Sequence, residues 1–467
     1  MTTGIRKKNL CEDNSLSVPV PEGALILGEG RYYSRDCYKT QLNNNVLVVG
    51  TSGCGKTRSV VMPNLLQASG SYVVSDPKGN LYKKLGPYLK SKGYEVVTMD
   101  FIHPGTSNRY NPLGYCRNTS DIQKLANVMV YQAGRSVQDP FWDQSSFMLL
   151  LAIIGYIIES DEFPESEKNF TTLRRLIAEA SRDEEISILE EAKNDPFLLG
   201  PTRPSHMRKS SSRSFSPLEL KMISYKNRMA ALGKESWAVE KFDEYNTSPD
   251  KTHQCINMTA LCKLVTFGSK EIRRMLSGND IQFAEIGQKP TALFVMVSDT
   301  DRSMDLLVNL FYTQLMNELC TYADDHCKNS CLPVPVQFIL DDFATNARID
   351  NFENMIANIR SRGISAMLMV QSEAQLSAGY GDNAQTIIDN CNTYVYMGGS
   401  DPDQAKRVAL RANKMTNTIL NMPLSYSWIF RRGEKPVFCH NFDLVRFEEE
   451  KGLYAEEETE EKECELK

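Results

Sequence analysis

The chain has 467 residues, of which 41% are hydrophobic and 24% are charged, and its formal net charge is −6. This length is too great for one compact core and predicts two or three domains. The twelve cysteines follow no regular framework, which argues against a disulfide-bonded secreted protein and favours reduced thiols in a cytoplasm.

The sequence predicts neither a membrane-spanning helix nor a signal peptide. The longest strongly apolar run, residues 147–158, has twelve residues, whereas a spanning helix needs about 20. Basic residues at Arg6, Lys7 and Lys8 are not followed by an apolar stretch. We therefore expect a cytoplasmic protein.

Negative charge is concentrated at the C-terminus. Residues 448–467 contain ten Glu and three Lys, a net charge of −7, so the rest of the chain is close to +1. The charge of the body therefore neither predicts nor excludes nucleic acid as a partner. We predict a disordered acidic tail over 448–467, which either keeps the protein in solution or docks a basic partner.

Residues 50–57 read GTSGCGKT and match the pattern G-x-x-x-x-G-K-[ST] at every fixed position. The apolar run at 45–49 predicts a strand before this loop, and residues 58–68 predict a helix after it. Strand, loop and helix together direct backbone N–H groups toward a phosphate chain. We expect Lys56 to reach the β- and γ-phosphates and the Thr57 hydroxyl to bind Mg²⁺. The residues expected to contact the nucleotide are Gly50, Thr51, Ser52, Gly53, Cys54, Gly55, Lys56, Thr57 and Arg58.

The remaining elements predict an α/β fold with a mostly parallel central sheet, interrupted by helices. Residues 1–43 form an entry segment with one short hairpin. Helical periodicity dominates residues 118–255, which predicts an all-α insertion domain. Strand and helix alternate in 44–117 and 256–447, so these two segments make up the nucleotide-binding domain. The strands expected in its sheet are residues 45–49, 71–75, 95–99, 291–297, 336–340, 365–370 and 393–397.

Acidic residues follow the strand VQFIL at 336–340. Asp341 is expected to order Mg²⁺ opposite Thr57, as the second half of a P-loop site requires. Asp342 occupies the position where many such ATPases carry the Glu that polarises the attacking water. Because Asp is one methylene shorter, either the water sits closer or its activation is weaker.

Three further features allow two interpretations each. Gln371 ends the next strand, where it either contacts the γ-phosphate or bonds to the backbone. Arg360 either neutralises charge at a neighbouring subunit's nucleotide or forms a surface salt bridge. The basic stretch at 203–213 is either a solvated loop or a contact to phosphates.

Taken together, these stretches resemble the TraG/TraD-like coupling proteins of type IV secretion. The matching segments include NNNVLVVGTSGCGKTRSVVMPNLL, VVSDPKGNLY, DPFWDQ, TALFVMVSDTD, FILDDFA, IRSRGISAMLMVQS and DNCNTYVYMGG, and they cover most of residues 44–400 in order. The resemblance implies a RecA-like P-loop NTPase interrupted by an all-α domain, assembled as a hexamer around a channel. It also implies ATP-driven pumping of single-stranded DNA, with its attached relaxase, toward a conjugation channel.

Carried over residue by residue, the resemblance gives Lys56 and Thr57 the Walker A roles, Asp341 the Walker B role and Gln371 the role of the strand-end glutamine. Arg360 falls where the family places an arginine that acts across subunits. The family usually has Asp-Glu at 341–342 and transmembrane helices at its N-terminus. The implied partners are therefore single-stranded DNA, relaxase and other relaxosome proteins, channel components and a membrane-anchoring partner at the inner face of the membrane.

Two other functions remain open at this point. One is a nucleotide-gated adaptor that recruits substrate with little ATP turnover, suggested by Asp342 and by the expected lack of an anchor. The other is a double-stranded DNA pump of the FtsK/HerA kind.

Overall fold

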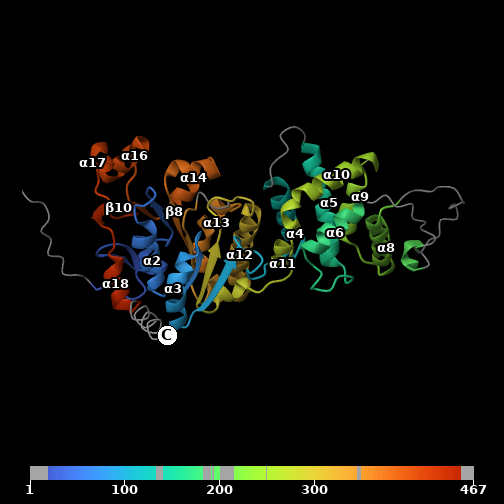
Figure 1. Ribbon diagram of the computed structural model, residues 1–467, viewed down its shortest axis with the longest axis horizontal. Coiled ribbons are helices and arrows are strands. Elements are labelled where there is room, and N and C mark those ends of the chain that lie inside the picture. The colour runs from blue at the N-terminus through green and yellow to red at the C-terminus, as the bar shows by residue number, and fades with distance from the viewer. Residues whose placement is uncertain are drawn as a thin grey trace, which may run out of the picture.

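The computed structural model describes residues 19–132, 140–181, 191, 194–199, 215–248, 250–343 and 349–453. The molecule is elongated, with a sheet and its covering helices at one end and a helical region at the other (Figure 1).

In the described part of the chain, nine strands form one sheet, in the order β11-β10-β9-β3-β8-β7-β4-β6-β5. The seven strands from β9 to β5 are parallel, which confirms the predicted α/β fold with a mostly parallel sheet. Most of their residues are buried, as expected for strands covered by helices on both faces. The strands are β3 (Val46–Val49), β4 (Ser71–Ser75), β5 (Glu95–Asp100), β6 (Thr291–Met296), β7 (Val336–Leu340), β8 (Ile364–Val370) and β9 (Thr393–Tyr396).

Two strands that the sequence did not predict extend the sheet beyond β9. The strands β10 (Tyr426–Arg431) and β11 (Val437–His440) form an antiparallel hairpin, and β10 pairs with β9. The predicted entry hairpin is present as β1 (Leu25–Gly28) and β2 (Arg31–Tyr33), a separate two-stranded sheet.

Helices cover both faces of the large sheet. One face packs against α2 (Met62–Leu66), α3 (Asn80–Ser91) and α18 (Leu444–Lys451), together with β1. The other face packs against a second set of helices, which also includes the short α13 (Phe352–Asn358) and α15 (Asn383–Asp389). The larger members of that set are α12 (Asp305–His326), α14 (Glu373–Tyr380) and α16 (Pro402–Ala412).

The helical region extends further along the chain than predicted. The predicted boundary at residue 255 falls inside α10 (Asp250–Lys263), which packs against α5 and α6, so α10 belongs to the helices and not to the sheet domain. The sequence also predicts a helix at 184–193, of which only residue 191 is described. The basic stretch at 203–213 lies outside the described residues. The other helices of the region are α4 (Thr119–Asn127), α5 (Pro140–Glu159), α6 (Phe170–Ala180), α8 (Pro217–Ala231), α9 (Trp237–Tyr245) and α11 (Lys270–Met275).

By length and composition, α5 is the one described helix that could cross a membrane. However, 67% of its most apolar window is buried within the fold. Its neighbours are α4, α6, α9 and α10, so α5 occupies the centre of the helical region, where a core helix of this composition belongs.

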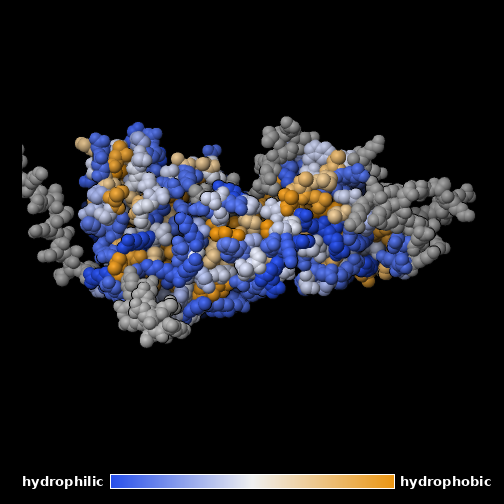
Figure 2. Space-filling view, viewed as in Figure 1, coloured by the Kyte–Doolittle hydropathy of each residue, from blue (hydrophilic) through white to orange (hydrophobic). Residues whose placement is uncertain are grey.

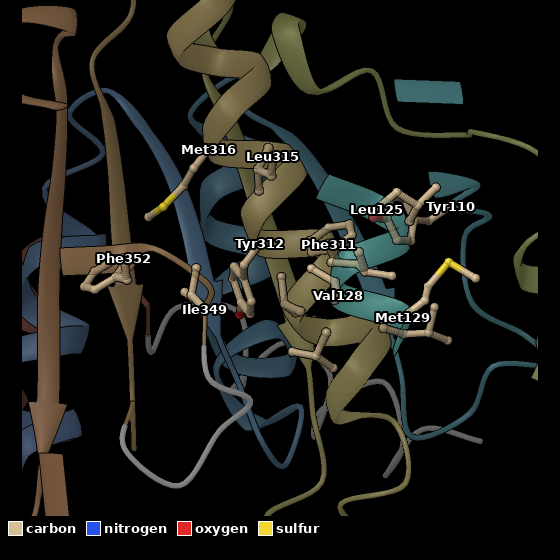
Figure 3. Close-up of a cluster of buried hydrophobic side chains, with 14 of the residues drawn as sticks. Tyr110, Leu125, Val128, Met129, Phe311, Tyr312, Leu315, Met316, Ile349 and Phe352 are labelled. Atoms are coloured by element: carbon tan, nitrogen blue, oxygen red, sulfur yellow. The ribbon is translucent and has the colours of Figure 1, made fainter. Parts of the chain in front are cut away.

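One helix joins the two ends of the molecule. Figure 3 shows Phe311 of α12 directed toward Tyr110, Leu125 and Val128, while Tyr312 and Met316 lie on the side of Ile349 and Phe352. The rings of Tyr110 and Phe311 meet edge to face with centroids 5.1 Å apart. The sheet and the helical region therefore share one continuous apolar core.

The prediction of a disordered tail from residue 448 is wrong at its start. Glu448 lies in α18, is 1% exposed and pairs with the Lys84 ammonium at 2.7 Å. Phe447 and Leu444 anchor the same helix in the core, which outweighs the charge repulsion that suggested disorder. Residues 454–467, which hold most of the predicted tail, lie outside the described part.

Candidate nucleotide site

The GTSGCGKT loop leaves β3 at the carboxyl edge of the sheet and leads into a π-helical turn, Thr57–Val61, that continues as α2. Gly53 and Gly55 have φ angles of +79° and +90°. Residues with a Cβ atom rarely adopt these angles, so both positions require glycine. A side chain at Gly53 would meet no other atom within 4 Å, so this part of the loop faces open space.

Lys56 lies inside the mouth of the loop, where it is 7% exposed. Its ammonium donates hydrogen bonds to the carbonyl oxygens of Gly50 at 2.6 Å and Thr51 at 3.2 Å. Neutral carbonyls are weaker partners for a buried cation than the charged oxygens of a phosphate. The lysine is therefore in a position to exchange these contacts for a phosphate chain.

Thr57 and Asp341 meet across the sheet edge. The Thr57 hydroxyl donates to the Asp341 carboxylate at 2.6 Å, although the two residues are 284 positions apart in the chain. Asp341 follows β7, and one strand, β8, lies between β7 and β3. A hydroxyl and a carboxylate oxygen are ligands that Mg²⁺ prefers, so the arrangement fits a magnesium ion.

Asp341 is 8% exposed, and burial raises the pKa of its carboxyl above the ordinary value. The hydrogen bond from Thr57 acts in the opposite direction, and the nearby Asp342 raises the pKa further. A bound cation would offset the cost of burying the charged carboxylate and would reduce its repulsion with Asp342. This is a second reason to place a metal here.

Asp342 continues the chain with φ +50°, in the left-handed region. Its backbone N–H donates to the Asp341 carboxylate at 3.1 Å, so the turn helps to hold Asp341 in place. Asp and Asn are the residues other than glycine that most readily adopt this conformation. The local backbone therefore favours the Asp that the sequence has at this position over Glu.

Gln371 directly follows β8 at the same carboxyl edge and is exposed. Its backbone N–H donates to the Gln375 side chain at 3.1 Å. Within the described residues its side-chain amide makes no hydrogen bond, so the amide remains available to a ligand.

Arg360 lies elsewhere. It belongs to a 3₁₀ turn, Ile359–Arg362, that precedes β8, whereas Gln371 follows that strand. Since β8 has seven residues, the two ends are about 20 Å apart. Arg360 is exposed and donates to the Cys37 carbonyl at 2.9 Å, so it does not join the P-loop of its own chain.

A family model described as type IV secretory system conjugative DNA transfer matches residues 3–420 of the chain. The chain belongs to this family. It is 22% identical over 386 residues to the type IV secretion system-coupling protein VirD4 of Bartonella quintana, an alignment covering 80% of this chain and 53% of that protein. It is also 22% identical to a conjugal transfer protein TraG of Escherichia coli, over 80% of this chain and 55% of the relative. The chain thus spans about half the length of the curated relatives it matches.

Solved structures of the conjugative coupling protein TrwB have the same fold. One such structure superimposes with a TM-score of 0.60 at 14% identity, covering 92% of this chain and 91% of TrwB. Other TrwB structures hold ADPNP, or ADP with Mg²⁺. The likeness confirms the RecA-like P-loop fold that the resemblance to coupling proteins implied.

The structure of this family member adds a residue that sequence reasoning did not assign to the site. Asp76 directly follows β4, and because Ser75 pairs with Leu340, the next position in register places Asp76 beside Asp341. Asp76 is 3% exposed, accepts the Tyr82 N–H at 2.8 Å at the start of α3, and has a pKa raised by burial. Its sequence signal is an acidic residue directly after the buried run SYVVS, the same pattern that identified Asp341.

Proposed function

We propose that the chain is the ATPase part of a coupling protein that delivers single-stranded DNA, with its attached relaxase, to a type IV secretion channel. The observation that supports this most strongly is the contact between Thr57 and Asp341, because it brings both halves of a P-loop site together without a ligand.

Each site residue takes a role in ATP hydrolysis. The Lys56 ammonium moves from the loop carbonyls to the β- and γ-phosphates. Thr57 and Asp341 hold Mg²⁺, which neutralises charge on the phosphate oxygens. Asp342 accepts a proton from the attacking water, directly or through a second water, and the free amide of Gln371 contacts the γ-phosphate.

The site is completed by a neighbouring copy in a ring, in which Arg360 of one subunit approaches the next subunit's nucleotide. For this, Arg360 must release the Cys37 carbonyl, an exposed and therefore weak contact. An exposed apolar surface on the sheet domain supports such an assembly. Leu410 and Met415, on and after α16, are 85% and 80% exposed, and Figure 2 shows hydrophobic surface over this part of the molecule.

The helical region takes the cytoplasmic substrate in this proposal, and the acidic tail docks basic relaxosome proteins. The protein works at the inner face of the cell membrane, held there by an anchoring partner. Family membership and the apolar core that joins the helical region to the sheet support this division of labour.

The test is ATP hydrolysis by the purified protein with and without single-stranded DNA, alongside the mass of the assembly. We expect hydrolysis to increase with DNA and to be lost in Lys56→Ala. A matched control is Lys289→Ala, which removes a surface lysine paired with Glu95 and Glu285 at the amino edge of the sheet. Hydrolysis by Lys56→Ala equal to that of the control would refute the site.

The left-handed backbone at Asp342 favours a second candidate, a nucleotide-gated adaptor with little turnover. A carboxylate fixed in this turn is shorter than the usual Glu and reaches less far toward a water. Tight ATP binding with negligible hydrolysis at any DNA concentration would favour the adaptor, and brisk hydrolysis would exclude it. Preference for double-stranded DNA in a binding assay would instead support an FtsK/HerA-like pump.

A further inference from the structure

Two of the site residues lie on the same side of the P-loop along the sheet edge. Asp341 and Gln371 follow β7 and β8, which lie on one side of β3. If the proposed function is correct, the γ-phosphate and Mg²⁺ point toward that side. The nucleoside must then leave the P-loop on the opposite side, over β9, β10 and β11.

A row of residues in register runs in that direction from the loop. The Thr51 N–H donates to the Gly398 carbonyl at 3.3 Å. Since Trp428 pairs with Tyr396, Tyr426 lies opposite Gly398, and Tyr426 in turn pairs with His440. Neighbouring strands lie about 4.8 Å apart, so Tyr426 is roughly 10 Å from the loop, within reach of the base of a bound nucleotide.

The end of this row is aromatic. The rings of Tyr426 and Phe438 are stacked with centroids 4.8 Å apart. The ring centroids of His440 and Tyr426 are 3.9 Å apart. Phe438 also packs against Trp428 at 4.9 Å. These cross-strand contacts stabilise the hairpin, yet Phe438 stays 41% exposed and His440 is exposed as well.

Leu424 adds exposed apolar surface at the same edge. It is 82% exposed and lies two residues before Tyr426, and its carbonyl accepts a hydrogen bond from the Asn441 side chain next to His440. Partly exposed rings beside an aliphatic side chain are the kind of surface on which a nucleobase stacks.

We propose that Tyr426, Phe438 and His440 form the stacking surface for the base of the nucleotide held by the P-loop. This assignment rests on the proposed nucleotide site and adds the part that recognises the nucleoside. Stacking uses the flat face that every base has, so adenine and guanine nucleotides bind with similar affinity at this surface.

The experiment compares two probes by titration calorimetry in Mg²⁺: a non-hydrolysable ATP analogue, and inorganic tripolyphosphate, which has no base. We expect Phe438→Ala and His440→Ala each to weaken binding of the ATP analogue about tenfold, in line with the 1–3 kcal/mol that base–aromatic stacking contributes. Binding of tripolyphosphate should be unchanged in both variants.

Phe141→Ala is the matched control. Phe141 is 40% exposed and packs against Trp142 at 5.1 Å, much as Phe438 packs against Trp428, but it lies in the helical region. Binding of the ATP analogue should be unchanged in this variant.

Unchanged binding of the ATP analogue in both hairpin variants would overturn the assignment, and so would an equal loss of both probes. Failure of the wild type to bind either probe would refute the nucleotide site itself, and this assignment with it. Phe438→Trp, which retains an aromatic ring, should restore binding of the ATP analogue.

Discussion

The contact between Thr57 and Asp341 can be measured as a coupling energy. Thr57→Val removes the hydroxyl and keeps the shape, while Asp341→Ala removes the acceptor oxygens. The bond is 2.6 Å long and its acceptor is 8% exposed, so solvent screens it little. A hydrogen bond to a charged group contributes about 1.5–3 kcal/mol, so a double-mutant cycle should give a coupling of this size.

The assay is urea unfolding of the wild type, both single variants and the double variant, without Mg²⁺ or nucleotide. Ser236→Ala and Glu159→Ala provide a reference cycle, because their hydroxyl and carboxylate are 2.7 Å apart but exposed. That cycle should give a smaller coupling, below about 1 kcal/mol. A Thr57–Asp341 coupling no larger than the reference would show that the two halves of the site do not meet in solution.

Three further results are expected. Burial raises the pKa of Asp341 above 3.8, so the free energy of unfolding should fall as pH rises through the folded-state pKa and the buried carboxyl becomes charged. Asp341→Asn should flatten this fall, which urea titration at several pH values measures. Gly50→Ala should lower the free energy of unfolding by about 1–3 kcal/mol in the same assay, because the added Cβ would lie 2.5 Å from the Cys54 sulfur and 3.0 Å from the Met397 Cβ. Adding Cys54→Ala should restore part of this loss. Asp342→Glu should lower stability by about 1 kcal/mol because of the left-handed backbone, while Asp342→Asn, measured in parallel, should not.

The parallel strands were predictable because helices cover both of their faces. A run such as VQFIL is apolar throughout, and its length and flanking polar residues distinguish it from a helix. The same reasoning explains why Lys56, Thr57 and Asp341 could be predicted to lie together, and the structure brings Thr57 into contact with Asp341. A P-loop and an acidic strand end identify a site by residue type, and a parallel sheet brings strand ends to one edge.

The edge hairpin escaped prediction for the opposite reason. The two strands, Tyr426–Arg431 and Val437–His440, mix apolar, aromatic and polar residues. Each strand is also short, so its pattern of alternation covers too few residues to be recognised. Helix α10 was divided because its sequence shows little amphipathic pattern, and only its packing against α5 and α6 assigns it to the helical region. Glu448 was assigned to the tail from local charge alone, since its partner, Lys84, is remote in the sequence.

The continuous core has a consequence for how the nucleotide acts on the helical region. Directly after Asp342, Phe343 packs against Phe352 with ring centroids 5.0 Å apart, and the backbone N–H of Asp350 donates to Asn309 of α12 at 3.3 Å. On its other side, Phe311 of α12 is directed toward Leu125 and Val128 of the helical region (Figure 3). A displacement of the segment after Asp341 therefore cannot leave α12 unaffected, because close-packed interiors transmit strain instead of absorbing it. Because α12 belongs to the apolar core that the sheet and the helical region share, we expect the helical region to move with α12.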